Sequence, residues 1–407
     1  MNYQRPPALV AAELGGYVKS YGASVRAMDK QVAATPGPVD LIDLTHGDTR
    51  AFTPPDSAHA DFDEAVHDNT EAYSAYRGSA TVRAILAPRA ATLLQRSVDP
   101  ATEIILTPGT QGGLFTSLSA LVAPGDVVAF PSREYFMDER ICAYLGATSH
   151  RIPLHQDSDG VITVEDNDLE LAARAGVRGI VLSHPNNPTG GVYAFESLER
   201  LAAWVVDHDL WAVVDQLYCR LIFRGHEYAH LGALPGMKSR TVTLIGPSKT
   251  ESMSGYRVGA AVGPSEVIES MEQVISFAAL RTGGYSQHTL RHWMEGDDEW
   301  LTRRTDAHQA IRDSLVARLT AIPGVFISTP AGSSYLFPDC SATPWAQARG
   351  ANDDFALTVD LKRAGVLVAP GYQFGLDGRG HFRINFSQDV ARLERACDII
   401  ERTLTCR

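Results

Sequence analysis

The feature of this sequence that most constrains its fold is a series of short apolar segments that alternate with helical ones between residues 103 and 245. The apolar segments are almost unbroken by polar residues, as expected for strands buried on both faces of a sheet. An alternation of this kind predicts a large α/β domain with a mixed, mostly parallel sheet between helices. The predicted strands are Glu103–Thr107, Asp126–Phe130, Arg178–Ser183, Leu210–Asp215 and Thr241–Ile245.

The pattern changes after about Gln287. Long helical segments and short strands then follow one another without the earlier alternation, which indicates a smaller α+β domain. Helices are predicted at 299–322, at 353–364 and from Asp389, and strands at 366–369 and 381–386.

The N-terminal segment combines a helical stretch at 8–34 with a short strand at 41–44. A polar loop that contains prolines then leads to a further helix after Gly78. We expect the N-terminal segment to pack on the small domain. The predicted organisation is therefore an N-terminal segment at 1–55, a large domain at 56–290 and a small domain at 291–407.

Composition excludes several classes of protein. The formal charge of -12 argues against nucleic acid or an anionic membrane as a general partner. No apolar run approaches the roughly 18 residues of a membrane span, and prolines and a glutamate make residues 1–16 a poor secretion signal. The five cysteines form no C-x-x-C pair, so we expect neither a metal site nor a disulfide framework. We expect the protein to be in a reducing compartment, the cytoplasm.

Polar clusters follow several predicted strands, at the ends where open α/β sheets bind ligands. Residues 107–111 join the first strand to a helix, where backbone N–H groups and the helix dipole make a seat for an anion. The alternative there is an ordinary turn capped by a threonine. Residues 184–190 follow another strand, and Asn187 would donate to a ligand oxygen unless this segment is only a proline-flanked turn.

A carboxylate ends a third strand at Asp215, with Tyr218 three residues later. A carboxylate at the end of an apolar strand is costly unless it is paired. It could hold a proton on a pyridine nitrogen and so make that ring an electron sink. Pairing with a structural arginine is the alternative.

A lysine directly follows the last of these strands. The segment 245–249 ends in Ser248 and Lys249, and Arg257 follows eight residues later. This combination suits an enzyme that carries a phosphorylated aldehyde, because the amine would form the imine while the hydroxyl and guanidinium hold the phosphate. The alternative is a surface lysine in a polar loop.

The segment His226–His230 reads HEYAH and matches a zinc-protease pattern. That pattern needs a helix to bring both histidines to one face. Glycines and a proline surround the segment, so we predict that it is not helical and expect no metal.

Taken together and in order, these clusters resemble the class I/II aminotransferases, a family of fold-type I pyridoxal-phosphate enzymes. The resemblance runs from about Leu41 to Phe386 and rests on N-N-P-T-G, D-x-x-Y and S-K followed by G-x-R. It implies pyridoxal 5′-phosphate as the cofactor and Lys249 as the lysine of the internal aldimine. It also implies that Asp215 pairs with the pyridinium nitrogen and that Tyr218 and Asn187 contact the phenolic oxygen. The implied phosphate cup comprises Gly109, Thr110, Ser248 and Arg257, with Gln111 beside it.

The resemblance extends to the substrate and to a partner subunit. Arg383 matches the arginine that binds the substrate α-carboxylate, with Asn187 and Gly47 nearby. A surface salt-bridge arginine is the alternative for Arg383. Tyr73 matches a tyrosine that reaches the phosphate of the neighbouring subunit, which implies a homodimer with shared active sites.

The aromatic residue that stacks on the cofactor ring is less direct to locate. In the family that this sequence resembles, this residue usually lies two residues after a proline and eleven before a glycine. Counting on from Pro131 gives Arg133, which has no aromatic face, whereas counting back from Gly146 gives Tyr135. We therefore infer a two-residue insertion within 132–134 and choose Tyr135, with Phe136 as second choice. The inserted residues are expected near the substrate side. A loop at 281–285 is expected near the partner's site.

The leading hypothesis is transfer of an amino group between an L-amino acid and a 2-oxo acid. A rival within the same cofactor class is elimination, cyclisation, or oxidative deamination coupled to decarboxylation, as in natural-product pathways. A non-catalytic binding protein on the same fold and a zinc hydrolase are the remaining alternatives. No second arginine for a dicarboxylate is evident, which disfavours aspartate or glutamate as the best donor.

Overall fold

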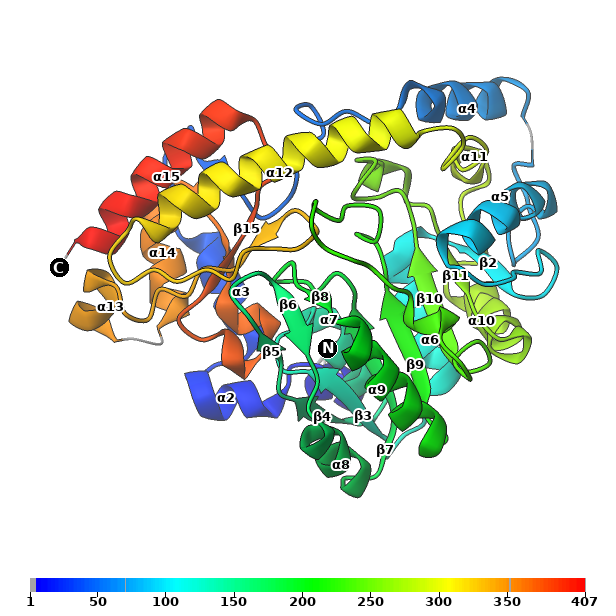
Figure 1. The fold of residues 1–407 in the computed structure, drawn as a ribbon, viewed down its shortest axis with the longest axis horizontal. Coiled ribbons are helices and arrows are strands. Elements are labelled where there is room, and N and C mark those ends of the chain that lie inside the picture. Colours follow the sequence, from blue (N-terminus) through cyan, green and yellow to red (C-terminus); the bar gives the residue numbers. More distant parts are fainter. Residues whose placement is uncertain (1–4, 70, 351–352, 407) are drawn as a thin grey trace.

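The computed structural model describes residues 5–69, 71–350 and 353–406. Its centre is a seven-stranded sheet with the strand order β2-β11-β10-β9-β7-β3-β4 (Figure 1). The strands from β10 to β4 are parallel, whereas β11 runs antiparallel to both of its neighbours. The prediction of a mixed, mostly parallel sheet is therefore confirmed. The strands are β2 (Ile104–Thr107), β3 (Val127–Pro131), β4 (Thr148–Ile152), β7 (Val177–Ser183), β9 (Trp211–Asp215), β10 (Thr241–Ile245) and β11 (Gly259–Val262).

Helices cover both faces of this sheet, because successive side chains of each strand point to opposite sides. In β9, Val213 packs in a cluster with α6, α7 and α10, whereas Ala212 and Val214 pack with α8 and α9. The helix α5 covers the edge formed by β2 and β11. These helices are α5 (Ala80–Leu93), α6 (Gly109–Leu121), α7 (Phe136–Tyr144), α8 (Asp166–Arg174), α9 (Phe195–Asp207) and α10 (Ser265–Ala278).

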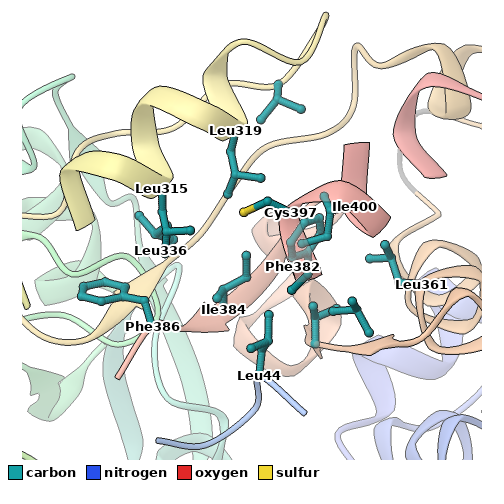
Figure 2. Packing of buried hydrophobic residues seen from close by; sticks show 14 of the residues in the cluster. Leu44, Leu315, Leu319, Leu336, Leu361, Phe382, Ile384, Phe386, Cys397 and Ile400 are labelled. Atoms are coloured by element: carbon teal, nitrogen blue, oxygen red, sulfur yellow. The ribbon is translucent and has the colours of Figure 1, made fainter. Parts of the chain in front are cut away.

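A second part of the molecule has its own core, shown in Figure 2. Leu315 and Leu319 from α12 and Ile400 from α15 pack there against Phe382 and Ile384 of the strand β15. Its elements are α12 (Asp298–Thr320), β12 (Tyr335–Leu336), α13 (Pro344–Arg349), α14 (Asp354–Ala364), β13 (Val366–Leu367), β14 (Ala369–Pro370), β15 (Phe382–Asn385) and α15 (Val390–Thr405).

The N-terminal segment contacts this second part directly. The strand β1 (Ile42–Asp43) pairs in parallel with β13, and Leu44 belongs to the same core as Phe382. The expected strand at 366–369 is divided into β13 and β14, because β13 pairs with β1 while β14 pairs with β15. The domain bounds 1–55, 56–290 and 291–407 stay a prediction.

Other segments differ from the sequence-based expectation. The proline-bearing loop contains the helix α4 (Asp56–His67), which begins directly after Pro55. The helical stretch at 8–34 is broken where Leu14 and Gly22 take positive φ. None of the described helices is both long and apolar enough to span a bilayer. The remaining elements are α1 (Pro7–Ala11), α2 (Gly15–Tyr21), α3 (Val25–Ala34), β5 (His155–Gln156), β6 (Val161–Thr163), β8 (Val192–Tyr193) and α11 (Gly284–His288).

Candidate active site

A cavity of about 610 Å³ lies where β7, β9 and β10 end, between the sheet and the second part of the molecule. Parallel strands present their carboxyl ends at one edge, so the chain segments that follow them converge there. Most of the predicted site residues line this cavity, namely Thr110, Gln111, Tyr135, Asn187, Asp215, Tyr218, Ser248, Lys249, Arg257 and Arg383.

The predicted acid and the predicted amine share this cavity. Asp215 is the last residue of β9, and its carboxylate accepts a hydrogen bond of 3.1 Å from the backbone N–H of Leu217. Burial raises the pKa of Asp215 to about 6, although the Leu217 N–H and the Lys249 ammonium both oppose the rise. A cation near this carboxylate, such as a protonated ring nitrogen, would favour its ionised form.

Two further carboxyl groups are buried behind Asp215. Glu134 accepts 2.8 Å and 2.9 Å hydrogen bonds from the backbone N–H groups of Tyr135 and Ser183, and Ser183 pairs with Asp215 across β7 and β9. Burial raises the pKa of Glu134 to about 7. Asp138 is buried with both carboxyl oxygens unpartnered among the described residues, and burial, then Glu134 and Asp215, raise its pKa well above the usual value. Glu134 and Asp138 thus form an acidic cluster with Asp215, which itself lines the cavity.

One end of the cavity carries groups of the kind that bind anions. The helix α6 begins at Gly109, and the Arg257 guanidinium lies so close that a Cβ on Gly109 would stand 2.5 Å from Nη2. Gly109 has φ of +71°, which a side chain would strain further. The Ser248 hydroxyl lies at the same end, is buried, and has no hydrogen-bond partner in the described part of the chain. Helix N–H groups, a guanidinium and a free hydroxyl together suit a phosphate.

Arg383 lines another part of the cavity. Its guanidinium donates to Asn187 Oδ1 at 2.7 Å and to the backbone oxygen of Thr45 at 3.2 Å. The Arg383 Nε–H is buried and unpartnered among the described residues. Arg383 is therefore not the surface salt-bridge arginine of the alternative interpretation.

Tyr135 also lines the cavity. Its hydroxyl donates a 3.1 Å hydrogen bond to Gln111 Oε1, which ties it to the first turn of α6. Phe136, the second choice, also lines the cavity and packs edge-on against Tyr135 with ring centroids 5.3 Å apart.

Three predicted residues lie outside the cavity lining. Gly109 lies just behind Thr110, where it makes room for Arg257. Gly47 packs beside Ser387, and its neighbours Thr45 and His46 line the cavity instead. Tyr73 is exposed, with 82% of its surface accessible.

Of the two expected neighbours of the site, the inserted residues differ from the expectation, whereas the place of the loop at 281–285 near the partner's site stays a prediction. Arg133 and Glu134 do not line the cavity, because the segment turns inward and Glu134 bonds to Ser183. The loop at 281–285 packs on Tyr73, with the Arg281 guanidinium 5.1 Å from the Tyr73 ring. The prediction that 226–230 is not helical is confirmed, and His230 pairs with Gln216 at 2.8 Å.

Sequence reasoning missed Tyr335 of β12. Its ring lies 4.0 Å from the Arg383 guanidinium carbon, and its hydroxyl accepts a 2.7 Å hydrogen bond from Tyr218. Residues 332–335 carry no motif that the sequence analysis used. The only available signal was a tyrosine near a short strand, which is far too common to select one residue.

Comparison with known families gives a match over most of the chain. Residues 39–400 match the family model of aminotransferases of class I and II. The arginine–pyruvate transaminase AruH of Pseudomonas aeruginosa is 29% identical over 359 residues, which cover 88% of each chain. An aspartate aminotransferase of Rhizobium meliloti (strain 1021) is also 29% identical, over 86% of this chain and 85% of that protein.

Solved structures give the same picture. An aspartate aminotransferase from Rhodobacter sphaeroides superimposes with a TM-score of 0.83 and 35% identity, covering 94% of this chain and 99% of that one. The aromatic aminotransferase from Pyrococcus horikoshii has a TM-score of 0.81 and 25% identity, over 93% and 98% of the two chains.

Proposed function

This chain belongs to the class I and II aminotransferase family and is an aminotransferase, and from that premise we propose that it uses pyridoxal phosphate bound at Lys249. The observation that carries the proposal is that Lys249, Asp215 and Arg383 line one cavity. These three groups are an amine, a buried acid and a guanidinium, which the transfer of an amino group from an α-amino acid requires.

The residues of the cavity fit this cofactor. Ser248 has a buried hydroxyl without a partner among the described residues, and the Gly109–Arg257 approach leaves no room for a side chain. Both features suit a phosphate that would accept hydrogen bonds from the hydroxyl, the guanidinium and the N-terminus of α6. Tyr135 would face the ring. Asp215 has no basic side chain bonded to it among the described residues and would take the protonated ring nitrogen.

Each group then has a definable task. When bound, pyridoxal phosphate supplies a ring that accepts the electrons of the Cα–H bond of the substrate. The Lys249 amine would remove the proton from the substrate Cα and deliver it to C4′, the cofactor carbon bonded to the same nitrogen. Asp215 holds the proton at the ring nitrogen, while Tyr218 and Asn187 hold the phenolic oxygen. Arg383 binds the α-carboxylate, and so orients the Cα–H bond toward the amine.

The substrates are an α-amino acid and a 2-oxo acid. In the described part of the chain, Arg257 and Arg383 are the arginines that line the cavity. We assign Arg257 to the phosphate and Arg383 to the α-carboxylate, which leaves no cavity arginine of the same described chain for a second carboxylate. This supports a donor other than aspartate or glutamate.

We further propose a homodimer with shared active sites. Tyr73 and Phe277 expose 82% and 78% of their surfaces, and Leu280 is exposed beside Arg281, which contacts the Tyr73 ring. Exposed large apolar groups of this kind favour burial against another protein. Arg257 is also exposed, so Tyr73 of a second copy has access to the phosphate end.

A cytoplasmic location remains part of the proposal. Cys142, Cys340 and Cys397 are buried thiols, and the described cysteines are free. Unpaired thiols are typical of a reducing compartment.

Transfer of a nitrogen label tests the function. The protein, loaded with pyridoxal phosphate, is incubated with ¹⁵N-labelled amino acids and an unlabelled 2-oxo acid. The proposal predicts ¹⁵N in the amino acid made from the oxo acid, with one oxo acid released for each label transferred. Multiple turnovers of an amino acid without any oxo acid, with release of ammonia, would contradict it and favour elimination or oxidative deamination.

A further inference from the structure

Tyr335 lines the cavity beside Arg383 and Tyr218. It is 3% exposed and pairs with Asn385 across β12 and β15. Side chains two residues apart on a strand share a face, so Arg383 projects on the same side of β15 as Asn385, diagonal to Tyr335. This register explains why the guanidinium carbon stands 4.0 Å from the centre of the Tyr335 ring.

The hydroxyl of Tyr335 faces a different neighbour. It accepts a 2.7 Å hydrogen bond from Tyr218, whose ring lies at 69° to its own with centroids 5.2 Å apart. Backbone bonds hold the two segments together, because Ser333 N–H donates to the Leu221 oxygen and Phe223 N–H donates to the Ala331 oxygen, both at 2.9 Å. These backbone bonds hold the segment after Tyr218 beside the segment before Tyr335, and so keep the two tyrosines in contact.

The charges around Tyr335 are unusual for a buried phenol. The titratable groups that face it are Arg383, Lys249, Tyr218 and Tyr135. Burial alone raises the pKa of Tyr335, but Arg383, then Lys249 and the Tyr218 hydrogen bond, outweigh burial and lower it. A phenol whose pKa is lowered is a better hydrogen-bond donor. When the Tyr218 O–H turns to the phenolic oxygen of a bound cofactor, the Tyr335 O–H can therefore donate to Tyr218 across the same contact.

We propose that Tyr335 is a positioning residue with two separable tasks: its ring face orients Arg383 for the substrate carboxylate, and its hydroxyl orients Tyr218. The inference rests on the proposed function and adds a residue to it. Because the two tasks use different atoms of one side chain, two substitutions separate them. Tyr335→Phe removes the hydroxyl and keeps the ring, whereas Tyr335→Leu removes both.

The carboxylate task is tested without knowledge of the natural substrate. Aminooxyacetate carries a carboxylate and O-methylhydroxylamine does not, and both capture the cofactor's aldehyde. The ratio of their second-order rate constants on the holoenzyme reports what Arg383 contributes. A guanidinium over an aromatic face is stabilised enough that its loss should lower this ratio about 2- to 30-fold in Tyr335→Leu. Tyr335→Phe should keep the wild-type ratio.

The hydroxyl task is read from the pH midpoint of the holoenzyme's visible absorbance. Tyr218→Phe should raise this midpoint by about 1 to 2 pH units, the value of a hydrogen bond to a charged oxygen. Tyr335→Phe should raise it in the same direction by roughly 0.2 to 0.6 unit, because the polarisation that Tyr335 lends to Tyr218 is a fraction of that bond. Tyr193→Phe, a buried tyrosine outside the cavity, is the matched control and should leave ratio and midpoint unchanged.

The outcomes separate the two levels of the argument. A wild-type protein that takes up no pyridoxal phosphate overturns the proposed function and this inference with it. A wild-type ratio in Tyr335→Leu, or a wild-type midpoint in Tyr335→Phe when Tyr218→Phe shifts, overturns the role of Tyr335 alone. Tyr335→Met replaces the leucine variant if thermal unfolding shows that the latter is not folded.

Discussion

The Arg383 guanidinium donates a 2.7 Å hydrogen bond to Asn187 Oδ1. Arg383 belongs to β15 and Asn187 to the loop after β7, so this bond joins the second part of the molecule to the sheet across the cavity. Both residues line the space where a substrate carboxylate would lie. The substrate therefore meets an arginine that is already oriented.

Arg383→Lys tests this relationship. A lysine cannot reproduce the fork that a guanidinium offers to a carboxylate, so at least one charge-assisted hydrogen bond is lost. We expect KM for the amino donor to rise about 10- to 100-fold, with affinity for pyridoxal phosphate unchanged. Arg395→Lys is the control, because Arg395 forms an exposed ion pair with Asp40 away from the cavity. Equal effects of the two substitutions would remove Arg383 from the substrate site.

Arg257→Ala tests the phosphate end. Removal of this guanidinium should weaken binding of pyridoxal phosphate about 10- to 100-fold, the value of a charge-assisted hydrogen bond. Binding of pyridoxal, which lacks the phosphate, should change much less. Fluorescence titration of both compounds gives the comparison. A parallel loss for both would mean that Arg257 does not face the phosphate.

Asp215→Asn tests the acid that ends β9. The amide keeps the shape but cannot hold a proton on a ring nitrogen, so kcat should fall by at least about 100-fold. Pyridoxal phosphate should still bind. Asp209→Asn, an exposed aspartate paired with Arg240, should have no such effect. A kcat within a few-fold of wild type in Asp215→Asn would be incompatible with the assigned role.

Asp138 gives a prediction about pH. Its pKa is raised in the folded state by burial, then by Glu134 and Asp215, so its contribution to stability is full below the unfolded value of about 4 and is lost as the pH rises through the higher folded value. Glu134 and Asp215, with pKa values of about 7 and about 6, act in the same direction. The cofactor-free protein should therefore become less stable between about pH 4 and pH 7.

Asp138→Asn should remove part of this pH dependence. Both Asp138 oxygens are unpartnered among the described residues, so the neutral amide should stabilise the protein by about 1 to 3 kcal/mol at pH 8 and by less at pH 5. Urea unfolding at the two pH values measures it. Asp166→Asn, in the first turn of α8 as Asp138 is in that of α7, controls for the helix dipole. A uniform effect of Asp138→Asn at both pH values would contradict the explanation.

Complementation tests the shared active site. If Tyr73 serves the partner's phosphate, Tyr73→Phe should weaken cofactor binding in its own homodimer. A mixture with Lys249→Ala forms hybrid dimers in which one site has both an intact Lys249 and an intact Tyr73. Mixing the two variants should therefore restore tight sites, up to a quarter of the total in a random mixture. No recovery after subunit exchange, with dimers seen by sedimentation, would place Tyr73 elsewhere.

Much of the fold was predictable because the sheet strands are buried on both faces. The strand prediction ending at Asp215 and the one at 241–245 are confirmed, since a continuous apolar run leaves few alternatives. The antiparallel strand β11 was not predicted. Its residues Gly259–Val262 are small, and what makes them a strand is pairing with β2 and β10, which no local pattern encodes.

The site was predictable where its residues follow strand ends in sequence. Lys249 and Asp215 share a cavity because β10 and β9 are parallel neighbours. Tyr335 and Asp138 were not predictable in this way. Tyr335 reaches the cavity through the register of β12 on β15, whereas Asp138 lies in the first turn of α7, where it is buried near Glu134 and Asp215. Both depend on distant parts of the chain coming together.

The most direct test of the account is the position of the bond to the cofactor. The protein is incubated with pyridoxal phosphate, reduced with borohydride, digested and analysed by mass spectrometry. The account predicts one modified peptide, with the phosphopyridoxyl group on Lys249 and none on the exposed Lys238. A modification spread over surface lysines, or a Lys249→Ala variant with an unchanged visible band and an equal yield of modified peptide, would contradict it.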